Sequence, residues 1–223
     1  EFQQICKYPE KNVEALLRSH IQHLSNVNFV FAGSERHLIS EMFLSSAKPF
    51  FNSTTQIELH SIVPEEYIPF VCKWFRAYQK NIDERDVQKV YQLFEGNTYC
   101  MQRTFHEAFI NTSSDETCTL DIIRKSLADI IEDNSHAYSR MLSQIPVRQK
   151  ELLYAIAKEG KAEKITGGTF IKKHTLLSAS SVQAAMKKLL DLDLITTDNG
   201  YYTIPDHFFS LYIRKLMECE EGL

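Results

Sequence analysis

A segment near the carboxyl-terminal end combines residue types that are suited to nucleic-acid binding. In SASSVQAAMKKLLDLDLI, apolar residues recur at helical spacing, so the polar and basic residues fall on the opposite side of an expected helix. Serine and glutamine can hydrogen-bond base edges, and lysine contacts phosphates. The candidate DNA contacts are Ser181, Gln183, Lys187 and Lys188, together with Lys172 and Lys173 in the preceding segment.

The charge around this helix supports a nucleic-acid contact only mildly. Between residues 145 and 195 there are nine lysines and arginines against five acids. Asp198 stands at the tip of an expected hairpin, where a wing that enters the minor groove would favour arginine or lysine. A solvated helix face and a protein-docking surface remain alternatives to DNA binding.

Other constellations that support catalysis are missing from the sequence. The eight histidines are scattered without HxxxH or HExxH spacing, so no zinc site is expected. No nucleophile-elbow or papain-like pattern occurs, and no G-x-x-x-x-G-K-[ST] phosphate loop is present. Gly167-Gly168 is followed by Thr169 and Phe170, with no lysine to reach a phosphate.

The elements that must position the basic helix follow a recognisable order over residues 145–223. PVRQKELLYAIAKEG and GTFIKKHT predict two helices, and Ser178 or Ser180 is expected to cap the third. Asn199-Gly200 then predicts a hairpin turn between LITT and YYTI, and DHFFSLYIRKL predicts a last helix. Three helices, a hairpin and a helix are the order of a winged helix-turn-helix.

The middle of the chain, residues 63–144, contains helical patterns alone. Pro64 is expected to open a helix that runs through Phe75, and Gly96 is expected to stop one that covers Val87 to Phe94. Residues 98–109 and 120–142 predict two more helices. We therefore expect a small helical bundle.

The amino-terminal part, residues 1–62, has a mixed pattern. A helix is expected from Pro9 to Ser25 and a short one from His37 to Phe43, with strands in VNFVFAGS and at 56–59. A strand that is apolar on both faces needs neighbours on both edges, and this part supplies too few. We therefore expect an incomplete sheet, whose preceding strand ends just before Glu1.

Composition bounds the whole chain. The 223 residues carry a formal net charge of −4, which argues against a generally basic nucleic-acid binder. Five cysteines, odd in number and never spaced as CxxC, indicate reduced thiols in a cytoplasmic protein, and no apolar run is long enough for a membrane helix. The expected fold is mainly α with an α/β portion.

The order of EFQQI, FVFAGS, PFF, GNTYCMQ and PDHFFSLYIRK resembles the carboxyl-terminal two-thirds of a prokaryotic AAA+ ATPase of the archaeal and bacterial STAND-like kind. The resemblance covers essentially the whole chain. It implies the distal part of a P-loop core at 1–62, a helical lid at 63–144 and a winged helix at 145–223. It also implies ATP and Mg²⁺ as cofactors of the intact family member.

The resemblance implies roles for single residues. Glu1 matches the second acid of the Walker B strand, which orients the attacking water, and Ser34 matches the polar residue of sensor 1 beside the γ-phosphate. The alternatives are that Glu1-Phe2 is a cloning remnant and that Ser34 caps the following helix. Gly96, Asn97 and Thr98 occupy the place of the Gly-x-Pro lid motif near adenine, but Thr98 replaces the proline, and a helix stop at Gly96 with a cap at Asn97 or Thr98 explains the same residues better.

The missing phosphate loop limits what this chain can do alone, because backbone amides and a lysine must cradle the triphosphate. We expect no ATP hydrolysis without an amino-terminal P-loop segment or chain. The leading hypothesis is a nucleotide-dependent switch with a winged helix that binds DNA or protein. The alternatives are a non-enzymatic DNA-binding regulator and a protein-interaction scaffold. A membrane partner is not expected.

Overall fold

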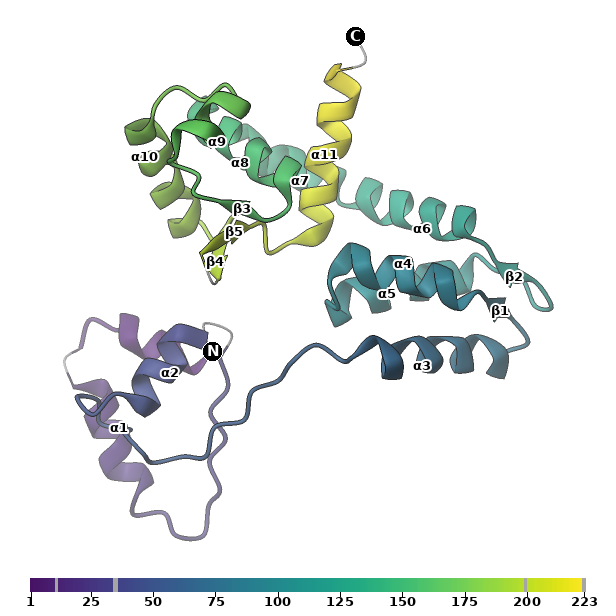
Figure 1. Ribbon diagram of the computed structural model, residues 1–223. Coiled ribbons are helices and arrows are strands. Elements are labelled where there is room, and N and C mark those ends of the chain that lie inside the picture. The colour runs from purple at the N-terminus through teal and green to yellow at the C-terminus, as the bar shows by residue number, and fades with distance from the viewer. Residues whose placement is uncertain (11, 34–35, 199, 222–223) are drawn as a thin grey trace. The chain divides into compact units, whose positions relative to one another are not determined.

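The computed structural model of the chain describes residues 1–10, 12–33, 36–198 and 200–221. The chain divides into two compact units, unit 1 (Glu1–His60) and unit 2 (Ser61–Leu223). Each unit is described by itself (Figure 1).

Unit 1 is built around a small aromatic cluster. Its elements are the 3-10 helix η1 (Phe2–Lys7) and the helices α1 (Val13–Ile21) and α2 (Arg36–Leu44). Phe2 and Phe31 pack on the buried residues Met42, Phe43 and Phe50. The helix predicted at 37–43 is confirmed as part of α2.

The helix predicted from Pro9 to Ser25 is shorter than expected. It begins at Val13, because Asn12 adopts a left-handed conformation with φ of 67° that cannot continue into a helix. Asparagine tolerates this conformation better than most residues. The left-handed turn therefore separates η1 from α1.

Both strands predicted in unit 1 are wrong for the described residues. Residues 27–33 and 56–59 have irregular backbone with no ladder partner. A strand requires hydrogen bonds to a neighbouring segment. Among the described residues of unit 1, the only backbone hydrogen bond from 27–33 or 56–59 to a distant segment joins the N–H of Phe2 to the carbonyl of Ala32 at 2.8 Å. The apolar pattern is present but unpaired.

The first part of unit 2 is a bundle of helices, as expected. It contains α3 (Pro64–Ala77), α4 (Glu84–Phe94), α5 (Thr98–Ile110), α6 (Leu120–Asp133) and α7 (Ser135–Ser143). The single helix predicted over 120–142 is wrong, since α6 ends at Asp133. The Asn134 side-chain amide donates to the carbonyl of Ile130 at 2.8 Å and so competes with the regular helical pattern.

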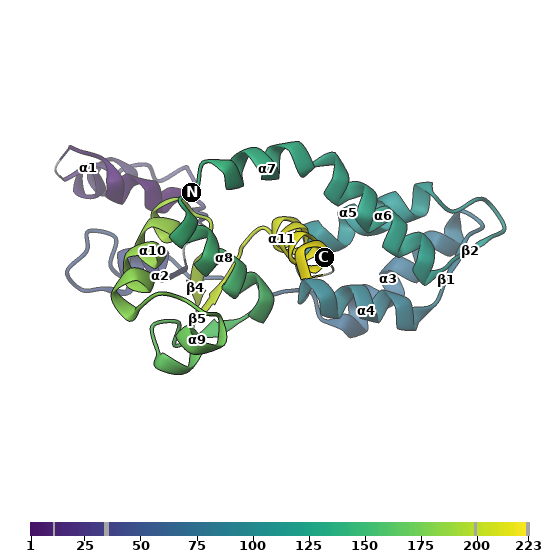
Figure 2. The same ribbon diagram turned by 90° about the horizontal axis from the view of Figure 1, so that it is seen from above.

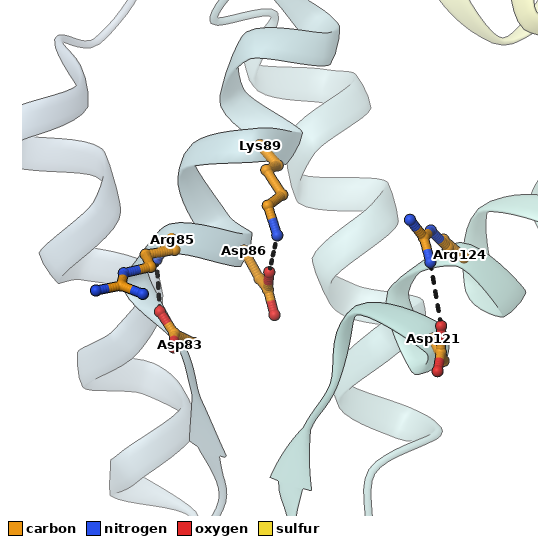
Figure 3. Close-up of polar contacts among 6 residues, drawn as sticks. All are labelled: Asp83, Arg85, Asp86, Lys89, Asp121 and Arg124. Carbon is orange, nitrogen blue, oxygen red and sulfur yellow. Dashed lines mark hydrogen bonds and ion pairs between the residues drawn. The ribbon is translucent and has the colours of Figure 1, made fainter.

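A parallel bridge aligns the starts of two bundle helices. Strand β1 (Asn81–Ile82) pairs with β2 (Thr117–Cys118), and each directly precedes a helix, α4 or α6. The side chain of Asp83 accepts from the N–H of Arg85 at 2.7 Å and caps α4 (Figure 3). The pairs Asp86–Lys89 and Asp121–Arg124 lie within single helix turns (Figure 3). Pairs this exposed contribute at most about 1 kcal/mol each.

The rest of unit 2 has the expected winged-helix order. Ser178 caps α10 by accepting from the N–H of Ser181 at 3.2 Å, which confirms one of the two predicted caps. The elements are α8 (Val147–Glu159), β3 (Ala162–Glu163), α9 (Gly168–Lys173), α10 (Ala179–Asp191), β4 (Thr196–Asp198), β5 (Tyr201–Thr203) and α11 (His207–Glu221).

The predicted hairpin is confirmed by β4 and β5, and β3 adds a third strand that the sequence did not indicate. The three strands form an antiparallel sheet in the order β3-β5-β4. One hydrophobic core runs from the bundle helices through the winged helix, with Leu152, Leu153 and Ile156 of α8 fully buried in it. Figure 2 shows α11 between the bundle helices α3 to α6 and the winged-helix elements α8 to α10.

Candidate functional site

Glu1 lies where a buried glutamine can hold its carboxylate. Nε2 of Gln3 donates a hydrogen bond to Glu1. Gln3 is fully buried, and its side-chain oxygen has no hydrogen-bond partner among residues 1–10, 12–33, 36–198 and 200–221. The hydrogen bond between Phe2 and Ala32 places this segment beside the one that ends at Gly33.

Gly33 lies where these two segments approach each other closely. A Cβ atom at this position would overlap the side-chain oxygen of Gln3 and come within 2.7 Å of Ile39. The structure thus brings the chain after Glu1 against the chain before Ser34. Ser34 itself lies outside the described residues, and its sensor 1 role stays a prediction.

The segment Gly96-Asn97-Thr98 joins two bundle helices. Gly96 has φ of 77°, and a Cβ there would come within 2.8 Å of Ser61 and 2.9 Å of the Tyr91 hydroxyl. Asn97 caps α5 by accepting from the N–H of Cys100 at 3.0 Å, and Thr98 is the first residue of that helix. The polar groups of this segment therefore build the local turn. The turn lies beside Ser61, the first residue of unit 2.

The outer side of α10 presents most of the predicted DNA contacts. Gln183, Lys187 and Lys188 are exposed, while Ser181 is half-buried next to its cap. Val182, Ala185 and Leu189 point into the core, as the periodicity predicts. Neither Lys187 nor Lys188 has an ion-pair partner in the part of the chain that the structure describes, so both charges are available to a ligand.

The two lysines of α9 differ in their surroundings. Lys173 forms an ion pair with Glu159 at 2.7 Å, and His174 contacts the same carboxylate at 2.7 Å. The hydrogen bond from Lys173 lowers the pKa of Glu159, with His174 adding to the effect. Lys172 is exposed and has no such partner within the described ranges. Lys172 is therefore better placed for a phosphate than Lys173.

The wing carries little positive charge. Asp198 is exposed at the end of β4, and Gly200 has φ of 84° in the turn. Asn199, the other residue of the predicted turn, lies outside the described residues. A hydrogen bond to Glu163 raises the pKa of Tyr201, so this tyrosine interacts with strand β3 of the same sheet.

A groove between α3 and α5 is absent from the sites that the sequence predicts. Phe70 and Trp74 of α3, Tyr78 directly after it, and Tyr99 and Arg103 of α5 line a cavity of about 590 Å³. The sequence did contain a signal for this groove. Phe70, Trp74 and Tyr78 recur at four-residue spacing, in addition to the residues of α3 that fill the core.

The comparisons with known proteins agree with this architecture. A family model described as "Probable winged helix domain" matches residues 136–215. No curated protein matches the sequence. Among solved structures, the chain is similar to a Walker-type ATPase of Pyrococcus abyssi, with a TM-score of 0.62 and 16% identity over 96% of this chain.

The alignment covers 61% of the length of the Pyrococcus abyssi chain. At this identity the likeness shows the fold alone: the chain shares the fold of part of a Walker-type ATPase and contains a winged-helix domain. Within the described residues, no helix is long and apolar enough to cross a membrane, and no group of three acidic, histidine or cysteine side chains is arranged to hold a metal ion.

Proposed function

We propose that the chain forms the distal part of a nucleotide-dependent switch ATPase of the STAND-like kind, with the winged helix as its output module. The observation that carries the proposal is the unpaired apolar chain of unit 1. Phe29 and Phe31 stack at 6.2 Å, and Phe31 packs on the aromatic cluster, while Val30 between them is 91% exposed. The rings of Phe29 and Phe31 lie on one side of the chain and Val30 on the other, as side chains alternate in a β-strand. We propose that this strand lacks its neighbours.

The second unpaired segment supports the same conclusion. Ile57 and Leu59 are 82% and 89% exposed, and they are two residues apart as on one face of a strand. Exposed apolar strands are avoided in complete folds because they aggregate. We infer that a phosphate-binding segment, from the same polypeptide or another one, completes a sheet on residues 27–33 and 56–60.

The residues of this chain do not by themselves fit ATP and Mg²⁺. The phosphate loop is absent from the sequence, so no backbone amides and lysine are available to cradle the phosphates. What the chain offers is the carboxylate of Glu1, held by Gln3 beside the 27–33 segment. Glu1 is the residue that we propose orients water once the phosphate loop is supplied.

The shared core of unit 2 suggests which part moves. Phe94 of α4 packs edge-on against Phe208 of α11 at 5.5 Å, and Tyr138 of α7 donates a hydrogen bond to Asp206 at 3.1 Å. These contacts tie the bundle to the winged helix. We propose that nucleotide binding moves unit 2 as one body relative to the P-loop core, and that the chain around Ser61 acts as the hinge.

Calorimetry with MgATP tests this proposal. We expect no binding to the 223-residue chain and micromolar binding to a longer product of the same gene, or to a complex with a second chain, that contributes the phosphate loop. In that assembly Glu1→Gln is expected to reduce hydrolysis at least 100-fold while ATP still binds. Tight magnesium-dependent binding by this chain alone would contradict the proposal.

A second candidate function, DNA binding by the winged helix, is favoured by the unpaired lysines Lys172, Lys187 and Lys188. Their contacts to phosphate would release counterions, so affinity for duplex DNA should fall steeply with salt. We expect the Lys187→Ala/Lys188→Ala variant to weaken binding at least 10-fold in fluorescence anisotropy. The matched variant Lys73→Ala/Lys125→Ala removes the same charge from α3 and α6 and should bind as the wild type does.

A further inference from the structure

The groove between α3 and α5, which we call the aromatic groove, is an exposed apolar surface on an otherwise well-packed unit. It is lined by Phe70 and Trp74 from α3, by Tyr78 directly after α3, and by Tyr99, Arg103 and His106 from α5. The side chains of Phe70, Trp74 and Tyr78 are about half exposed, at 48%, 50% and 57%. Contiguous apolar surface of this kind indicates an interaction site more often than a solvated face.

The core of unit 2 does not account for these side chains. Helix α3 already contributes Tyr67, Val71 and Phe75 to the core, where each is at most 5% exposed. Phe70 and Trp74 of α3 and Tyr78 at its end form a separate row, with ring centroids 6.2 Å apart from Phe70 to Trp74 and again from Trp74 to Tyr78. Helix α3 therefore has two apolar faces, and only one of them is covered within its own unit.

The charge of the groove indicates the chemistry of what covers the second face. Arg103 is exposed and has no hydrogen-bond or ion-pair partner within the ranges that the structure describes. No carboxylate is among the lining residues. The nearby ammonium of Lys80 is already engaged, since it donates to the carbonyl of Phe109 at 2.6 Å and lies 3.8 Å from the centre of that ring. The free guanidinium is thus complementary to an acidic group.

The shape of the groove indicates the form of the partner. The aromatic row runs from Phe70 in α3 to Tyr78 at the end of that helix, which is eight residue steps, or about 12 Å at 1.5 Å per residue. A partner helix that lies along it would place side chains at i, i+3 or i+4, and i+7 between these rings. We propose that the aromatic groove docks an acidic amphipathic helix of a partner protein, with apolar side chains on α3 and a carboxylate on Arg103. This proposal does not depend on the ATPase function proposed above.

A peptide selection on the full chain tests the proposal. The probe is a displayed library of 16-residue helices with an apolar stripe of Leu, Ile and Phe and with Glu, Lys or Gln allowed at each polar position. We expect the selected peptides to be enriched in Glu beside the stripe. Trp74 is the only tryptophan of the chain, so binding should change the intrinsic fluorescence directly.

Two variants and one control separate groove binding from general apolar adhesion. Arg103→Glu should weaken the selected acidic peptides at least 10-fold and should select Lys instead of Glu from the same library. Trp74→Ala should weaken binding at least 10-fold in anisotropy of a labelled peptide. Arg124→Glu removes another exposed arginine, on α6, and should leave binding unchanged.

The selection also has outcomes that would overturn the proposal. If the selected peptides have no bias toward Glu, only apolar contact matters. If none of the selected peptides depends on Trp74 for binding, the groove does not dock helices. Equal loss of affinity in Arg103→Glu and Arg124→Glu would show that net charge, rather than the groove, attracts the acidic peptides.

Discussion

Units 1 and 2 differ in how completely they bury their apolar side chains. In unit 2 one core extends over the bundle and the winged helix, and Leu153, Ile156 and Leu189 are completely excluded from solvent. In unit 1 the cluster centres on Met42, Phe43 and Phe50, while Val30 remains almost fully exposed. Similar residue types thus have opposite environments in the two units.

The contrast teaches that apolar composition alone does not decide whether side chains become buried. The helices of unit 2 satisfy their own backbone hydrogen bonds, so they need only side-chain partners, which lie within the same unit. A strand needs a neighbouring strand for its backbone as well. Among the described residues of unit 1, segments 27–33 and 56–59 have no ladder partner, and Val30, Ile57 and Leu59 within them are exposed.

The largest expected difference between the units is in hydrogen exchange. Backbone amides of α8 and α10 are protected by the global stability of unit 2, whereas residues 27–33 and 56–60 have almost no backbone hydrogen bonds. We expect protection to differ by about 10⁴-fold or more, as stabilities of 5–15 kcal/mol imply. Mass spectrometry on the full chain measures this, and comparable protection in both regions would mean that unit 1 is complete as it stands.

A pair of core and surface substitutions should show the same contrast in free energy. Leu153→Ala creates a cavity in the core and should lower the free energy of unfolding by about 2–5 kcal/mol. Val30→Ala removes an exposed side chain and should change it by less than about 0.5 kcal/mol. Denaturant titration followed by circular dichroism gives both values. A large effect of Val30→Ala would show that this side chain is packed in solution.

Helix caps should give a smaller difference. Asn97 accepts a hydrogen bond at the start of α5, so Asn97→Ala should lower the free energy of unfolding by about 1 kcal/mol. Asn12 precedes α1 with φ of 67° and makes no side-chain cap bond, so Asn12→Gly should be nearly neutral or stabilising. Thermal unfolding of the two variants compares them. Equal losses would mean that both asparagines act as caps.

The smallest effect concerns pH. Burial lowers the pKa of His207, which contacts the ring of Phe94, so the unfolded state takes up a proton at higher pH than the folded state does. The stability from neutral His207 is present above its unfolded pKa of about 6.5 and is lost as pH falls toward the folded value. His207→Gln should therefore flatten the decrease in Tm of unit 2 below pH 6.5. An unchanged slope would contradict this assignment.

Most helices of the chain could be predicted from the sequence because their signals are local. The periodicity of Val182, Ala185 and Leu189 gives the buried face of α10, and Ser178 gives its start. The break at Asn134 could not be predicted with the same ease, since asparagine also occurs inside helices. It depends on one side-chain hydrogen bond to the carbonyl of Ile130.

The candidate site was predictable only in part. Exposed Lys187 and Lys188 follow from the helix periodicity, but the pairing of Lys173 with Glu159 depends on how α8 and α9 pack. The contact between the Glu1 segment and Ala32 joins residues about thirty positions apart, and no local pattern specifies it. The aromatic groove likewise requires α3 and α5 to lie side by side.

The sequence by itself determined most of the helices, the Ser178 cap, the β4–β5 hairpin and the absence of a phosphate loop, because each of these depends on residues within a few positions of one another. Only the tertiary structure decided that residues 27–33 have no strand partner among the described residues, that the bundle and the winged helix share one core, and that Arg103 lines the same groove as an aromatic row from another part of the bundle. Hydrogen-bonded pairing and side-chain packing join residues far apart in the chain, and their outcome depends on the whole fold.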